Sequence, residues 1–253
     1  MTIPFIKMHG LGNDYVYIDC FQPEIAAWIA SLDVSLLARR MSDRHRGVGS
    51  DGLVLMMPSE QADIRMRMFN ADGSEAEMCG NAARCIGKYA YENGLCGNPM
   101  TLETKAGIKQ LSLQVDAANR VETVTVAMGK TTGNPHEVFF VDSLEALNPH
   151  FESLRDDISF ADLRARANIE CAYVNNNQEI TMRVCERGTG ETMACGTGAC
   201  ATAVAAMDKG LTEHTVTVHL PGGDLSVRRD EKGIIYLTGT ATEVFKGSYH
   251  WEE

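Results

Sequence analysis

The sequence lacks the features of several common functional classes. No stretch approaches the about 18 continuous apolar residues of a membrane-spanning helix, and the N-terminal MTIPFIKMHG has no basic segment followed by an apolar run. There is no GxGxxG after an expected strand, no P-loop and no CxxC pair. The 23 Lys and Arg are outnumbered by 34 Asp and Glu. We therefore expect a cytoplasmic protein without a metal site or cofactor, and without a nucleic-acid or membrane partner.

What is present fits a globular chain rich in strands. Its 253 residues, 44% of them hydrophobic, suffice for one large domain or two small ones with real cores. Short apolar runs with β-branched residues alternate with helix-like stretches. The expected strands are YVYID (15–19), GLVLMM (52–57), IRMRMF (64–69), VETVTVAM (121–128), EVFFVD (137–142), ITMRVC (180–185), TVTVHL (215–220) and GIIYLTG (233–239). Two small-residue helices are expected, from near Gly80 to Gly94 and from near Gly196 to Gly210.

An internal repeat organises the chain. At a shift of 116 positions, IRMRMFNADGSEAEMCGNAARC (64–85) aligns without a gap on ITMRVCERGTGETMACGTGACA (180–201). An upstream echo pairs GNDYVYID with GNPHEVFFVD. The aligned identities include Ile64 with Ile180, Arg67 with Arg183, Glu75 with Glu191, Cys79 with Cys195, and Gly80 with Gly196. We predict two similar halves, 1–119 and 120–253, with the option that the tail from about 241 packs back on the first half.

Two of the eight cysteines, Cys79 and Cys195, directly precede the expected helices. In the absence of a secretion signal we expect no disulfide framework, and the other six cysteines are read as small buried hydrophobes. A thiol at a helix N-terminus has a pKa lowered from about 8.5. Gly80 and Gly196 allow a ligand to approach the backbone, and such a helix start suits a carboxylate. One thiolate and one thiol on opposite faces of an α-carbon could invert a stereocentre by two-base proton transfer.

At these residues the chain resembles the diaminopimelate epimerases over nearly its whole length. The motifs are KMHGLGNDYVYID, RGVGSDGLV, FNADGSEAEMCGNAARCIGKY, GNPH, ANIE, ERGTGETMACGTGACATAVAA and LPGGDLSV, in the family's order. The resemblance implies an α/β fold of the α+β roll type. It has two pseudo-symmetric halves, each a curved mixed or antiparallel sheet around a central helix, with the active site in the cleft between them. It also implies a homodimer that converts LL- to meso-diaminopimelate without a cofactor, for lysine and cell-wall precursor synthesis.

The resemblance also implies roles for individual residues. Cys79 and Cys195 match the acid/base pair. The matched substrate-binding residues are Gly80, Asn81, Gly196 and Thr197 at the reacting carboxylate, and Asn13, Asn70, Asn134, Asn168, Glu186 and Arg187 at the ammonium groups and the far carboxylate. An arginine fork suits a carboxylate, and amide or carboxylate oxygens suit ammonium groups. Glu75 and Glu191 are read as structural, and His45 and His136 as satisfied loop histidines.

Two departures from the family pattern leave alternatives open. Gly52 stands where the family often has Gln, and residues 143–167 match poorly in a region expected to border the distal pocket. A related cofactor-independent racemase, acting on histidine or lanthionine, is one alternative. A thiol redox or metal-binding protein, in which Cys79 and Cys195 pair, is another. A non-catalytic binder that keeps the fold is the third.

Overall fold

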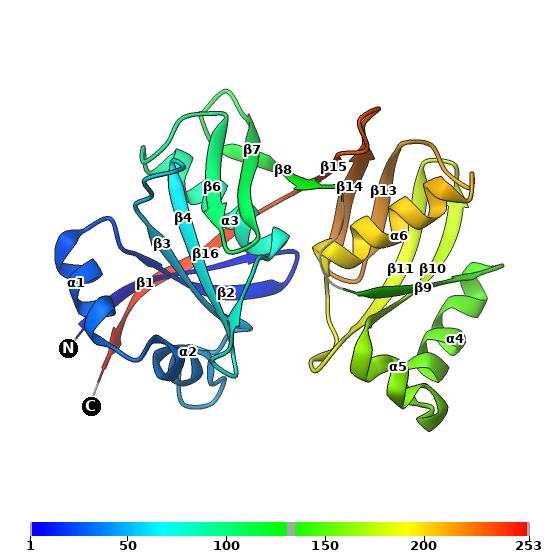
Figure 1. Cartoon of the computed structure of the whole chain (residues 1–253), viewed down its shortest axis with the longest axis horizontal. Helices are drawn as coiled ribbons and strands as arrows, with labels where there is room; N and C mark the ends of the chain where they lie inside the picture. Colours follow the sequence, from blue (N-terminus) through cyan, green and yellow to red (C-terminus); the bar gives the residue numbers. More distant parts are fainter. Residues whose placement is uncertain (1, 131–134, 252–253) are drawn as a thin grey trace. The chain divides into compact units, whose positions relative to one another are not determined.

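The computed structural model describes residues 2–130 and 135–251. It divides into two compact units (Figure 1). The first contains the chain up to Gly10, Asp14–Val126, and the chain from Thr240 on; the second contains Leu11–Asn13 and Ala127–Gly239. No helix within the described residues is long and apolar enough to cross a membrane.

The first unit builds a mixed sheet in the order β16-β1-β2-β3-β4-β6-β7-β8, with the short β5 paired to β4. Its C-terminal strand β16 runs antiparallel to the N-terminal β1, so the two ends of the chain share one edge of this sheet. The elements are β1 (Thr2–Gly10), β2 (Asn13–Asp19), α1 (Pro23–Ser31), α2 (Val34–Ser42), β3 (Gly52–Met57), β4 (Ile64–Asn70), β5 (Glu75–Ala76), α3 (Gly80–Glu92), β6 (Met100–Thr104), β7 (Gly107–Val115), β8 (Val121–Gly129) and β16 (Thr242–His250).

The second unit builds a sheet in the order β15-β14-β13-β11-β10-β9, with β12 paired to β11. Its elements are β9 (His136–Val141), α4 (Leu144–Asp156), the 3-10 turn η1 (Ile158–Phe160), α5 (Ala161–Arg166), β10 (Asn168–Asn176), β11 (Glu179–Glu186), β12 (Gly190–Glu191), α6 (Gly196–Asp208), β13 (Thr215–Leu220), β14 (Gly223–Arg229) and β15 (Ile235–Gly239).

The two units repeat one pairing pattern. In the first, β2 runs parallel to β3, β3 antiparallel to β4, β4 parallel to β6, and β6, β7 and β8 follow antiparallel. In the second, β9, β10, β11, β13, β14 and β15 follow the same sequence of parallel and antiparallel pairs. Helices α3 and α6 occupy the same place in each order, after the short β5 and β12. The predicted α/β fold of two similar halves is thus confirmed.

Each sheet is covered on both faces. In the first unit α1 and α2 contribute to a core with Val16, Ile18, Leu53 and Leu55, while α3 buries its small residues. In the second unit α4 packs on Ile169, Cys171 and Cys185, and α6 lies against the other face of the strands. Successive strand residues point to opposite faces. The intervening Asn168 and Glu170 therefore point towards α6, as their contacts with Cys195 and Gly198 show.

The divergent segment 143–167 is folded and buries apolar side chains. Ser143 caps α4 by accepting a hydrogen bond from the Ala146 N–H. Leu147, Phe151 and Leu154 are buried against β10 and β11, in a cluster that we call the α4 core. That this segment borders the distal pocket stays a prediction, and within the second unit its Arg155 pairs with Glu191 of the β11–β12 hairpin. The helices of the segment pack on the sheet face opposite to α6, and therefore away from Cys195, because alternate residues of β10 serve the two faces.

Candidate active site

Cys195 is the N-cap residue of α6. Its extended backbone (φ −121°, ψ 109°) turns the side chain back over the first helical turn, where the Gly198 N–H donates to Sγ at 3.3 Å. The Thr197 hydroxyl lies 3.4 Å from the same sulfur. These are the groups that a helix start offers to an anion. The predicted position of this cysteine, one residue before the helix, is confirmed.

Asn168 and the hairpin between β11 and β12 surround this thiol. The Asn168 amide nitrogen lies 4.0 Å from Cys195 Sγ, and its oxygen accepts a hydrogen bond from the Arg187 N–H at 2.9 Å. The Thr192 hydroxyl donates to the Glu186 carboxylate at 2.5 Å. Four residues predicted from the second half therefore gather with Thr197 in one cluster: Asn168, Glu186, Arg187 and Cys195. The Arg187 residue is exposed, which leaves its guanidinium available to a carboxylate in solution.

The pKa of Cys195 is raised well above the ordinary thiol value. Burial is the main cause, because it disfavours the thiolate, and the Glu186 and Glu170 carboxylates raise the pKa further. The hydrogen bonds from Thr197 and Gly198 act in the opposite direction and are outweighed. The expectation of a lowered pKa is therefore wrong for this cysteine. It stays a neutral thiol at neutral pH and is suited to donate a proton.

A buried His–Glu pair lies beneath the first turn of α6. His136 Nδ1 is 2.7 Å from Glu170 Oε1, and the two side chains are 3% and 0% exposed. A Cβ placed on Gly198 would lie 2.7 Å from that same carboxylate oxygen, so Glu170 packs directly on the helix start. Burial raises the pKa of Glu170, and the contact with His136 lowers it in part. His136 is thus the first residue of β9 and a partner of a buried carboxyl beside the site, not the loop histidine that the sequence predicts.

Cys79 occupies the corresponding place in the first unit. It is the N-cap of α3, again with extended backbone (φ −136°, ψ 124°), and it is half-buried. Gly80 and Asn81 follow it and are both buried. The Asn81 side-chain oxygen Oδ1 accepts from Arg84 Nη2 at 2.9 Å, and Arg84 Nε donates to the backbone carbonyl of Thr240. The buried arginine thus fixes Asn81 in the first helical turn.

Four predicted residues remain, and each lies in a different setting. Asn70 ends β4, and its amide donates to Ser74 Oγ at 2.9 Å within the β4–β5 hairpin. Asn13 begins β2 and clusters with the second unit. Asn134 lies outside the described residues. Gly196 is buried as the first residue of α6.

Gly52 has a physical reason to lack a side chain. A Cβ there would lie 2.1 Å from the Phe69 carbonyl oxygen on the neighbouring strand. The strand register identifies the equivalent residue of the second unit. Phe69 and Cys185 are equivalent in the repeat, and they pair with Leu53 and Ile169. The residues just before these partners, Gly52 and Asn168, are therefore equivalent. The first unit therefore has no amide at this position.

Sequence reasoning missed Glu170. The residue stands inside the quoted ANIE motif, in a strand that otherwise reads as apolar, and a charged residue in such a strand is the signal that could have found it. Val54 occupies the equivalent position of the first unit, by the same register. Within the described ranges, no group of three or more His, Cys, Asp or Glu side chains is placed to hold a metal ion.

Comparison with known proteins gives one family. The family model described as diaminopimelate epimerase matches residues 5–132 and 130–244. Diaminopimelate epimerases of Desulfitobacterium hafniense and Acetivibrio thermocellus are 44% and 42% identical, covering 96% and 98% of this chain and 96% and 99% of theirs. A solved PhzF-family phenazine biosynthesis protein of Bacillus anthracis has a similar fold, with a TM-score of 0.72 at 20% identity over 98% of this chain and 99% of that one. The chain belongs to the diaminopimelate epimerase family.

Proposed function

We propose that this chain is an isomerase that interconverts LL- and meso-diaminopimelate, with Cys79 and Cys195 as the two proton-transfer groups. The observation that carries the proposal is the repeated helix start, because each unit has a cysteine as the N-cap of an equivalent helix. One thiolate removes the α-proton, and the other thiol delivers a proton to the opposite face of the carbanion. The main-chain N–H groups of the two first turns would bind the reacting carboxylate.

Two cysteines in unlike surroundings fit the two roles. Cys195 is buried beside Glu186 and holds its proton, which suits the acid. When the reaction runs in the reverse direction the same thiol, once deprotonated, becomes the base. We assign the far end of the substrate to Asn13, Asn70, Asn134, Asn168, Glu186 and Arg187, where Arg187 would hold the distal carboxylate and the amides and Glu186 the ammonium groups.

Further aspects belong to the same proposal. We propose that the protein works in the cytoplasm as a homodimer, without pyridoxal phosphate or metal, and that its product supplies lysine and cell-wall precursors. Light scattering of the purified chain would check the dimer. A mass near 27.7 kDa, which is that of one chain, would exclude it.

The decisive experiment is α-proton exchange. The reduced protein, with no cofactor added, is incubated with LL-diaminopimelate in deuterated water, and deuterium and configuration at the α-carbon are followed. Deuterium should enter together with conversion to the meso isomer, and Cys79→Ala and Cys195→Ala should each abolish net conversion. A folded, reduced protein that exchanges histidine or lanthionine but not diaminopimelate would replace the substrate assignment. Unchanged activity in both cysteine variants would overturn the mechanism.

A further inference from the structure

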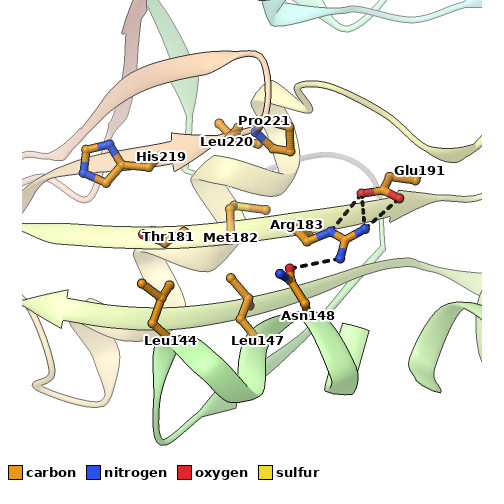
Figure 2. Close-up of a pocket in the computed structure, with 10 residues that line it drawn as sticks. All are labelled: Leu144, Leu147, Asn148, Thr181, Met182, Arg183, Glu191, His219, Leu220 and Pro221. Carbon is orange, nitrogen blue, oxygen red and sulfur yellow. Dashed lines mark hydrogen bonds and ion pairs between the residues drawn. The ribbon is translucent and has the colours of Figure 1, made fainter. Parts of the chain in front are cut away.

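The internal repeat preserves an ion pair as well as a cysteine. In the first unit Arg67 Nε lies 2.7 Å from Glu75 Oε1. In the second, the equivalent Arg183 contacts both oxygens of Glu191, with Nε 2.9 Å from Oε1 and Nη2 3.0 Å from Oε2 (Figure 2). Each glutamate stands four residues before the cysteine. Both arginines come from the strand that leads into the hairpin, so each pair joins the two strands of that hairpin.

The hairpin of the second unit has little main-chain pairing, so side chains hold it: the ion pair acts beside the Asn168–Arg187 and Thr192–Glu186 hydrogen bonds. Strand β12 consists of two residues, paired as Cys185 with Glu191 and Glu186 with Gly190. The connecting turn contains Gly188 and Gly190 at φ +80° and +84°, and the Thr192 N–H reaches the Val184 carbonyl only at 3.4 Å. A short strand beside a glycine-rich turn is free to move unless a side chain anchors it.

Helix α4 strengthens this anchor in the second unit. Arg155, on α4, donates through Nη1 to Glu191 Oε2 at 3.0 Å and also pairs with Asp156. The Asn148 amide oxygen accepts from Arg183 Nη1 at 3.0 Å (Figure 2). Phe151, which is fully buried in the α4 core, stacks under the Arg183 guanidinium at 4.2 Å. Glu191 therefore forms ion pairs with two arginines. Arg155 belongs to α4, and Arg183 is held by Asn148 and Phe151 of α4. A bidentate pair inside such a network is stronger and more directional than an isolated surface pair.

We propose that Glu191 is a positioning residue, through which α4 fixes the Glu186–Glu191 hairpin in its substrate-binding geometry. The inference rests on the proposed function, in which Glu186 and Arg187, at the turn end of this hairpin, bind the distal end of the substrate. Cys195 is held separately, by the packing of α6 and by the Gly198 N–H. Loss of the anchor therefore weakens substrate binding more than it weakens proton transfer.

The test compares Glu191→Gln with Glu152→Gln. Glu152 is the matched control because it also faces Arg183, but from α4 and at 3.9 Å, so its contact does not join the two strands of the hairpin. We expect Glu191→Gln to raise KM for diaminopimelate about tenfold and to change kcat by less than about threefold, as a displaced binding group should. Glu152→Gln should leave both unchanged. Equal KM values in the two variants, or a loss confined to kcat, would overturn the proposal.

Hydrogen exchange separates this proposal from the assignment of the reaction. Without substrate, the amides of residues 186–192 should exchange faster in Glu191→Gln than in the wild type or in Glu152→Gln, at an unchanged melting temperature. That readout stands even if the wild type does not turn over diaminopimelate. If Glu191→Gln does not fold, Arg155→Gln removes one of the two arms and should show a smaller effect of the same sign. Exchange rates equal to those of the wild type in either folded variant would refute the anchor.

Discussion

Glu170 holds His136 through a single contact, with Oε1 2.7 Å from Nδ1, although both side chains are almost fully buried. Within the described part of the chain, the second carboxylate oxygen and the other ring nitrogen have no hydrogen-bond partner. Each unpaired buried polar atom costs about 1–3 kcal/mol. The pair abuts Gly198 and raises the pKa of Cys195 through the Glu170 charge. We interpret it as a costly feature of the site.

Replacing this carboxyl should change stability in a pH-dependent way. Burial raises the pKa of Glu170 above its value in the unfolded chain. A group with a raised folded pKa gives its full contribution below the unfolded pKa, and the contribution is lost as pH rises through the folded pKa. Glu170→Gln should therefore gain melting temperature relative to the wild type as the pH rises from the ordinary carboxyl pKa of 4.5 into the range where the buried Glu170 ionises. Scanning calorimetry at several pH values measures this; a difference that is constant or shrinks over that range would contradict it.

Removing the Glu186 charge should make Cys195 a stronger acid. Among the causes that raise the pKa of Cys195, this charge is second to burial. In Glu186→Gln the thiolate should form at lower pH, so alkylation of Cys195 by iodoacetamide should begin at lower pH than in the wild type. Peptide mass spectrometry resolves this cysteine from the others. Cys171, buried against α4, provides the internal control, because Glu186 is not among the groups that shift its pKa and its reactivity should be the same in both proteins.

The amide of Asn168 should matter for hairpin geometry as well as for the thiol. Its oxygen accepts the Arg187 N–H, so Asn168→Ala removes a hydrogen bond worth about 0.5–1.5 kcal/mol. We expect KM for diaminopimelate to rise and the melting temperature to fall. Asn168→Asp keeps the acceptor and should recover stability, whereas its charge should raise the pKa of Cys195 and depress kcat. Equal kinetics in the two variants would refute this division of roles.

Much of the fold could be predicted because its strands and helices follow from short sequence patterns, and because one of these patterns occurs twice. Alternating apolar residues gave the strands, and the 116-residue repeat gave two similar halves with a cysteine before each helix. Segment 143–167 matches the family motifs poorly, yet Ser143 and the spacing of Leu147, Phe151 and Leu154 are typical of a capped amphipathic helix, which is what the segment forms.

The missed parts of the site depend on burial and strand register, which sequence does not show. The helix N-terminus alone predicts a lowered thiol pKa, but full burial of Cys195 beside two carboxylates reverses the sign. His136 reads as a loop residue until β9 is paired in parallel with β10, which places it beside Glu170. From the sequence, Gly52 only lacks a polar side chain. The strand register shows that the Phe69 carbonyl leaves no room for a side chain there.

Gly198→Ala tests how tightly Glu170 packs on the first turn of α6. Helix propensity alone predicts a gain of about 1 kcal/mol, since Ala is a better helix former than Gly. The added Cβ, however, would lie 2.7 Å from Glu170 Oε1 and 3.3 Å from Cys195 Sγ, and both side chains are buried. Overpacking costs about 1–3 kcal/mol. This cost should exceed the gain from helix propensity, so the melting temperature should fall.

The double variant decides whether that loss arises from Glu170. In Glu170→Ala the carboxylate is gone, and Gly198→Ala added to it should be neutral or stabilising. A coupling of about 1 kcal/mol or more between the two sites, measured by denaturant unfolding, would place the clash between them. Additive losses would instead locate it at Cys195, the next nearest side chain. In that case Gly198→Ala should lower turnover also in the Glu170→Ala background, because the added Cβ then displaces Cys195, the proposed acid.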